Sequence, residues 1–286
     1  MNTKRRLTGL GLFEYEFMRN ALLAGLLGGI ACSLVGVFVV SMHLSFIGVC
    51  LSHAAFAGAI IALFFGFNPV AGAFVFSLGA AAAIGPLADR GDFNPDTSLG
   101  IVFSLMLGLS FLFLGLMPGP KTQALGLMWG SILTVTPEHL VLLGVAAVLV
   151  LGTVTVFFKE VQAVIFSREI ALAVGLPATW TLYGLLLLTG LTVTVSLQPI
   201  GGLLIFSLIL NPAAAAYQLT YSLRALFVLA GCFGVLSCWT GLALAYLFNL
   251  PSGATIVVFS TLVFVLASIF SPKRRVKQLT ETEGIQ

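Results

Sequence analysis

The sequence predicts an all-α, multi-pass membrane protein with eight to nine transmembrane helices in a single domain that spans residues 1–286. Hydrophobic residues make up 59% of the chain and charged residues only 8%, whereas about a quarter of a soluble domain is charged. The apolar residues gather in runs of about 20, the length that a helix needs to cross the hydrocarbon core of a bilayer. The net charge of +3 is small and argues against a nucleic-acid partner.

Nine such runs follow one another, and a proline or an asparagine–proline pair marks most of the boundaries. The predicted spans are residues 18–41, 45–66, 69–88, 97–117, 138–158, 178–197, 200–219, 224–248 and 253–271. The gaps are too short for a soluble domain. The longest apolar gap, residues 118–138, is broken by glycine and proline and predicts an external loop with a short helix.

Lysine and arginine in the loops predict the orientation, because cytoplasmic loops carry an excess of both. The basic tail 273–277 is expected inside, and alternation of the spans then places Arg224 and the loop 159–168 on the same side. This arrangement leaves the N-terminus outside, although the basic residues 4–6 favour the inside. One segment that enters and leaves on the same side, giving eight true spans, is the alternative.

The second run contains an unusual polar group, His53, within the segment SFIGVCLSHAAFAG that covers Ser45–Gly58. Cys50 lies three residues before it on the same helix face, and Ser52 is its neighbour. Lipid offers an imidazole no hydrogen-bond partner, so His53 must face protein, a cavity or a metal ion. The residues alone leave open a structural histidine and a residue that lines a transport path.

The loop between the fifth and sixth runs predicts a short amphipathic helix over residues 166–175. Its apolar stripe consists of Phe166, Ile170, Ala173 and Val174. Ser167 is suited to cap its N-terminus, Arg168 and Glu169 fall in its first turn, and Gly175 with Pro177 ends it. It is either a plain interfacial helix or a helix that docks on a partner protein.

The seventh run is interrupted by Asn211 and Pro212, which predict a helix break or kink at a cavity or a moving joint. The chain carries no HExxH, GxSxG or Walker sequence, so we expect no enzymatic activity of its own. The runs also show no clearly buried carboxylate or lysine of the kind that ion-coupled carriers use. Energy from a separate ATPase is therefore favoured over a gradient.

Several stretches together resemble one family, the membrane permease subunit of ATP-binding-cassette importers for zinc, manganese and iron. The matching pieces are LMWGSILTVTPEHL (Leu127–Leu140), LPSGATIVV (Leu250–Val258), PIGGLLIFSLILNPAAAA (Pro199–Ala216), PDTSLGIVFS (Pro95–Ser104) and the His53 segment. They occur in the family's order and spacing, and the resemblance covers almost the whole chain.

The resemblance implies a type II importer permease that forms a homodimer in a prokaryotic-type cytoplasmic membrane. Each subunit would dock a cytoplasmic ATP-binding subunit through the coupling helix, here Phe166–Gly175, and ATP would be hydrolysed on that partner. An external metal-binding protein would deliver the cargo. No permanently bound cofactor is expected, since the divalent metal (zinc, manganese or iron) is the transported substrate.

The family's second span usually reads Gly-Asp-x-x-Ser-His, and its Asp and His handle the metal. Gly48, Ser52 and His53 match this pattern, but Val49 stands at the position of the Asp, and Cys50 follows it. If Cys50 and His53 both lined the path, loss of the hard oxygen would favour zinc or copper(I) over manganese. Val49 leaves open an ATP-driven importer of a metal chelate or another small solute; a carrier or channel outside this family and a membrane scaffold or receptor are further alternatives.

Overall fold

The computed structural model describes residues 16–90, 95–118, 121, 125–126 and 130–273, and within these ranges the regular structure is helical. The basic residues 4–6 and 274–277 and the matching residues 127–129 lie outside the described residues. The elements are α2 (Glu16–Ser41), α3 (Ile47–Phe64), α4 (Pro69–Arg90), α5 (Pro95–Leu116), η2 (Ile132–Thr134), α7 (Pro137–Val156), α8 (Phe158–Phe166), α9 (Arg168–Ala173), α10 (Ala178–Ile200), α11 (Gly202–Leu219), α12 (Leu223–Phe248) and α13 (Ser252–Ile269).

Nine of the described helices are long and apolar enough to cross a membrane, and they coincide with the nine predicted spans. No predicted boundary differs from the observed one by more than about three residues, the usual uncertainty of a hydropathy boundary. The described structure thus gives a helix of spanning length for every segment, which favours nine spans over the eight-span alternative.

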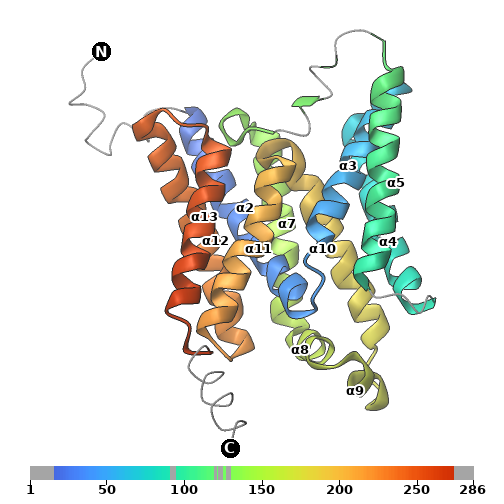
Figure 1. Cartoon of the computed structure of the whole chain (residues 1–286), viewed down its shortest axis with the longest axis vertical. Coiled ribbons are helices and arrows are strands. Elements are labelled where there is room, and N and C mark those ends of the chain that lie inside the picture. The colour runs from blue at the N-terminus through green and yellow to red at the C-terminus, as the bar shows by residue number, and fades with distance from the viewer. Residues whose placement is uncertain (1–15, 91–94, 119–120, 122–124, 127–129, 274–286) are drawn as a thin grey trace, which may run out of the picture.

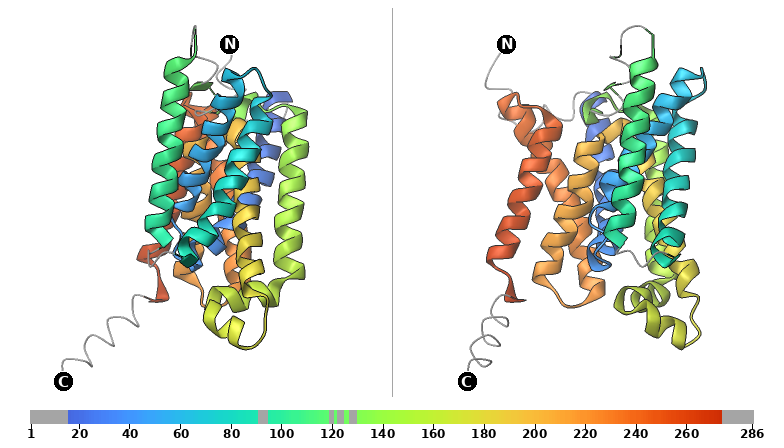
Figure 2. Two further views of the ribbon diagram at one scale, coloured as in Figure 1. Left: turned by 90° about the vertical axis from the view of Figure 1, so that its right-hand side faces the viewer. Right: turned by 45° about the vertical axis from the view of Figure 1, so that its right-hand side comes forward.

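The long helices run up and down between two ends of the molecule (Figure 1). The short helices α8 and α9 lie at one end, together with the C-terminal end of α13; we call this the α8–α9 end. The opposite end, which we call the η2 end, holds η2 and the start of α2. Figure 2 shows α12 and α13 on one side of the bundle and α4 and α5 on the other. Helix α2 is central, contacts α7, α10, α11 and α12, and forms much of the core.

Two glycines allow α3 and α4 to cross closely. A Cβ atom at Gly58 would overlap the carbonyl of Gly72, and a Cβ at Gly72 would overlap the carbonyl of Gly58. Small residues at such a contact let helix backbones approach within a bilayer, where packing rather than hydrophobic burial drives helix association. This contact holds α3, the helix that carries His53, against the bundle.

Helix α11 runs without a break through Asn211 and Pro212, so of the break or kink that the sequence predicts there, the break does not form. Proline has no backbone N–H, so it leaves the carbonyl four residues earlier, that of Leu208, without its helical donor. The hydroxyl of Ser33 on α2 donates to this carbonyl at 3.3 Å. A side chain distant in sequence therefore supplies the bond that Pro212 removes and stabilises the continuous helix.

Candidate functional site: a cavity at His53

His53 lies in the second turn of α3 and lines a cavity of about 250 Å³ between α3, α10 and α11. The cavity is lined by Val49, Ser52, His53, Phe56, Leu197, Gly202, Leu203 and Phe206. The turn between α10 and α11 brings two of its walls together, because Gly201 has φ +91° and lets the chain reverse directly. The imidazole is thus the one titratable group in a mostly apolar chamber.

The ring of His53 is held in one orientation from two sides. Its Nδ1 lies 3.0 Å from the carbonyl oxygen of Val49, one helical turn earlier. The Phe103 ring of α5 meets it edge to face, with centroids 4.9 Å apart. A carbonyl only accepts, so Nδ1 carries a proton, and in the neutral ring the free lone pair is on Nε2. Backbone carbonyls fix metal-ligating histidines in this way, and Nε2 is the atom that could bind a metal ion.

The structure brings Ser52 to the cavity but not Cys50. The Ser52 hydroxyl donates to the Gly48 carbonyl at 2.7 Å, which leaves its oxygen lone pairs for a further donor or ion. Cys50 is fully buried among the core residues of the bundle and is not a lining residue. Val49 does line the cavity, so an apolar side chain occupies the wall where the family pattern has a carboxylate.

The cavity therefore offers one nitrogen ligand and one hydroxyl. Within the described part of the chain, no group of three or more His, Cys, Asp or Glu side chains could hold a metal ion. A single neutral imidazole suits zinc, iron, manganese and copper alike and binds each of them weakly.

A second small cavity, of about 160 Å³, lies toward the η2 end and includes Glu138 and His139 at the start of α7. The backbone N–H of Thr136 donates to Nδ1 of His139 at 3.4 Å. The other ring nitrogen, Nε2, therefore carries the proton, and it lies 3.1 Å from Oε1 of Gln198 on α10. Both nitrogens of His139 thus serve helix capping and the contact between α7 and α10.

Asn211 takes part in a polar cluster that the sequence did not reveal. Its Nδ2 lies 3.0 Å from the hydroxyls of Ser207, Ser260 and Thr261. The Ser207 and Ser260 hydroxyls are 2.7 Å apart. The amide has two hydrogens for three acceptors, which must share them. The cluster ties α11 to α13, and its members on α13 could not be recognised because they lie about 50 residues away.

The predicted docking helix is divided in two. Phe166 ends α8, and Ser167 adopts an extended conformation and caps α9, accepting from the N–H of Ile170 at 3.3 Å. The N-cap and the stop at Gly175 (φ +83°) agree with the sequence, but the continuous helix over residues 166–175 does not form. An extended residue cannot continue a helix, so the break falls at the cap itself.

The short helices expose an apolar stripe at the α8–α9 end. Phe166 is 82% exposed, Ile170 56% and Val174 68%. Arg168 and Glu169 lie beside this stripe in the first turn of α9, and Nη2 of Arg168 donates to the Thr179 hydroxyl of α10 at 3.3 Å. Apolar side chains exposed next to charged ones are typical of a surface that meets a partner protein or the membrane interface.

Comparisons with known proteins agree with this arrangement. The chain is 33% identical to the manganese transport system membrane protein MntC of Listeria monocytogenes over 264 residues, 92% of this chain and 94% of that protein. It is 29% identical to the high-affinity zinc uptake system membrane protein ZnuB of Haemophilus influenzae, covering 91% and 99%. The structure of PsaBC from Streptococcus pneumoniae in complex with Fab superposes with a TM-score of 0.83 at 28% identity, covering 98% of this chain and all of that one. The model of the ABC 3 transport family matches residues 14–271, and the chain is a member of that family.

Proposed function

We propose that the chain is the permease subunit of an ATP-driven importer of divalent metal ions. The observation that carries this proposal is the similarity over nearly the full length to membrane proteins of manganese and zinc transport systems. The cavity at His53 supports it, since it presents one oriented imidazole nitrogen in an otherwise apolar chamber. We place His53 on the transport path with Ser52 beside it, and we leave Cys50 in the core.

Coupling to ATP follows from the connection between α9 and α10. Phe166, Ile170 and Val174 form the docking surface for a cytoplasmic ATP-binding subunit, which hydrolyses the nucleotide. Helix α10 starts five residues after α9, and the contact between Arg168 and Thr179 joins the two. The far end of α10 reaches the His53 cavity at Leu197. A displacement of α9 would therefore be transmitted along the single helix α10 to the wall of the cavity.

The remaining partners follow from this orientation. The α8–α9 end faces the cytoplasm of a prokaryotic-type cell, and the η2 end receives metal from an external binding protein. Two copies of the chain form the importer, so that a second His53 joins the first along the path. Pairing would raise the number of imidazole ligands without any carboxylate. Asn211, which is hydrogen-bonded to Ser260 of α13, and Pro212 remain our proposed joint for movement of α11.

The experiment that tests this function is purification of the chain with its ATP-binding subunit, followed by measurement of metal-dependent ATP hydrolysis in lipid. The proposal predicts a stable complex whose hydrolysis rate rises when manganese or zinc is delivered to the η2 end. A chain that transports metal alone, with no ATP-binding subunit, would contradict it.

One observation favours a second candidate, an importer of a metal chelate or another small solute. Val49, Phe56, Leu203 and Phe206 make the cavity apolar, and an apolar wall suits an organic ligand better than a bare ion. The same assay separates the two candidates. A chelate importer would hydrolyse ATP faster with the chelate and would show no response to the free ion.

A further inference from the structure

A long groove opens on the side of the bundle between α7 and α12, with α2 as its floor. Its volume is about 1080 Å³, and its wall is formed by Ile30, Leu34, Leu151, Val154, Thr155, Val156, Phe158, Lys159, Glu160, Arg224, Phe227, Val228, Gly231, Cys232, Val235, Leu236 and Trp239. It shares no lining residue with the His53 cavity, whose walls come from α3, α10 and α11. It is therefore separate from the proposed transport path.

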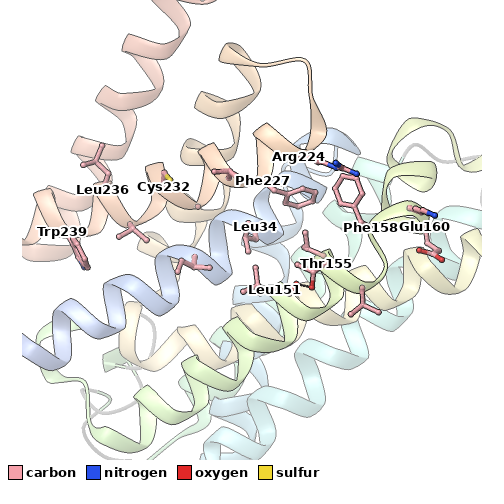
Figure 3. A pocket seen from close by; sticks show the side chains of 17 residues that line it. Leu34, Leu151, Thr155, Phe158, Glu160, Arg224, Phe227, Cys232, Leu236 and Trp239 are labelled. Atoms are coloured by element: carbon pink, nitrogen blue, oxygen red, sulfur yellow. Dashed lines mark hydrogen bonds between the residues drawn. The ribbon is translucent and has the colours of Figure 1, made fainter.

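The charges of the groove lie at one of its ends. Figure 3 shows Arg224 above the Phe158 ring, and its Cζ atom lies 5.4 Å from the ring centroid. Lys159, the second residue of α8, also lines the groove at the α8–α9 end of the molecule. Glu160 also lines this end, but it equally lines the neighbouring cavity on the other side of α8. Two cations against one shared carboxylate leave this end positive.

Beyond that end the groove is apolar and its rim is exposed. Val228 is 65% exposed, Leu236 47% and Val156 72%, so the groove opens sideways to whatever surrounds the helices. From Arg224 to Trp239, the last residue of α12 that lines the groove, the helix advances 15 residues, or roughly 22 Å at 1.5 Å per residue. One leaflet of the hydrocarbon core is about 15 Å thick, half of the usual 30 Å. The groove below Arg224 is thus long enough to hold one acyl chain.

We propose that this groove binds one anionic phospholipid of the cytoplasmic leaflet. The phosphate would lie between Arg224 and Lys159, and an acyl chain would fill the groove along Phe227, Gly231 and Val235. Arginine and lysine at the membrane surface attract anionic headgroups, each by about fivefold in affinity. The leaflet assignment rests on the orientation in the proposed function, but the lipid site itself requires neither metal nor ATP.

The groove also touches the element that couples the permease to its ATPase. Phe158, Lys159 and Glu160 form the first turn of α8, which leads into α9. A lipid held at Arg224 would therefore stabilise the position of α8 relative to α12. Binding of the lipid would therefore affect the position of the docking surface.

The test uses the full-length chain in nanodiscs with equal amounts of phosphatidylglycerol and phosphatidylcholine, followed by native mass spectrometry of the lipid that stays bound. The wild type is expected to retain one phosphatidylglycerol in preference to phosphatidylcholine. The double variant Lys159→Gln/Arg224→Gln is expected to lose that preference by about fivefold or more, since both headgroup cations are removed. Lys273→Gln is the matched control and should keep it, because Lys273 lies at the same end over the Tyr217 ring and away from the groove.

A second variant fills the groove instead of removing its charge. A Cβ at Gly231 would meet only the tip of Leu34, at 4.0 Å, so Gly231→Leu occupies the open space without disturbing a backbone. It should lower retention of both lipids. Equal retention of the two lipids by the wild type, or unchanged retention in Gly231→Leu, would overturn the proposal.

The groove could instead be covered by a second copy of the chain, and Cys232 distinguishes this case. Cys232 lines the groove and is exposed, whereas Cys32, Cys50 and Cys238 are buried. A short bismaleimide is expected to leave the chain uncross-linked through Cys232 in phosphatidylglycerol nanodiscs. An efficient cross-link between two Cys232 residues would place a second copy in the groove and would also overturn the lipid site.

Discussion

The imidazole of His53 is oriented by its own helix and by one neighbouring ring. The Val49 carbonyl fixes the proton on Nδ1, and the Phe103 ring prevents the imidazole from turning away. The same residue position, Val49, contributes nothing through its side chain except apolar contact. The backbone of this position therefore orients the imidazole, while its side chain offers no ligand atom.

Restoring that ligand gives the first prediction. Val49→Asp places a carboxylate four residues before His53, on the same face of α3 and inside the cavity. The affinity for manganese should rise by about tenfold, or about 1.4 kcal/mol, because a hard oxygen ligand is added. Isothermal titration calorimetry of the purified protein with manganese and with zinc measures the two affinities. Val49→Asn is the uncharged control, and equal gains in Asp and Asn would show that charge is not the cause.

Ser33 carries the second prediction. Ser33→Ala leaves the Leu208 carbonyl of α11 without a donor beside Pro212, and the free energy of unfolding should fall by about 1 kcal/mol. Ser237→Ala on α12 is the matched control, since this buried hydroxyl has no hydrogen-bond partner in the described structure. Thermal unfolding in detergent compares the two. If both variants unfold at the same temperature, Ser33 does not support α11.

At the scale of the elements, hydropathy was sufficient to locate all nine spans within about three residues, because each span must match the bilayer thickness. Local signals also predicted the Ser167 cap and the stop at Gly175 correctly. They did not predict features that depend on a side chain distant in the sequence. One such feature is the hydrogen bond from Ser33 that supports the continuous helix α11 beside Pro212.

The sequence alone also could not show which residues line the His53 cavity. Leu197, Leu203 and Phe206 come from α10 and α11, about 150 residues away from His53. Periodicity predicts which residues face inward but not which helices meet. The separation of Cys50 from His53 has the same origin, because the neighbours of α3 determine which part of its face is open.

The exposed stripe of α8 and α9 gives the third prediction. Phe166→Ala should weaken association with the ATP-binding subunit by about 30-fold, the effect of losing a central aromatic contact of about 2 kcal/mol. Folding should be unchanged, because the side chain is 82% exposed. Tyr221→Ala, an aromatic residue that is 71% exposed at the same end, is the control. Co-purification and surface-plasmon binding measure the loss, and equal binding by Phe166→Ala and the wild type would remove the stripe as the docking surface.

The fourth prediction concerns the close contact between α3 and α4. Gly58→Leu forces these helices apart at Gly72 and should destabilise the protein by roughly 2–3 kcal/mol. Gly79→Leu on α4 has open space around its Cβ and should be tolerated. Thermal unfolding and the yield of monodisperse protein report the difference. A Gly58→Leu variant as stable as Gly79→Leu would show that the crossing is not tight.

At the scale of the whole molecule, our proposal places the transport path and the coupling to ATP at different parts of a bundle centred on α2. The docking surface and the His53 cavity lie far apart, and α10 joins them. The proposed lipid groove lies on another side, between α7 and α12, and meets the same α8. The three proposed sites, for metal, for the ATP-binding subunit and for lipid, thus lie at different parts of one bundle.

The central claim is that a divalent metal ion passes His53 when ATP is hydrolysed by a partner. It is tested most directly by metal accumulation in proteoliposomes that contain the chain and its ATP-binding subunit. We predict ATP-dependent accumulation of manganese or zinc that His53→Ala reduces by at least about tenfold, since even groups that only orient a metal ligand are worth that much. His43→Asn, at an exposed histidine between α2 and α3, should transport normally. Equal accumulation by wild type and His53→Ala, or accumulation without ATP, would contradict the claim.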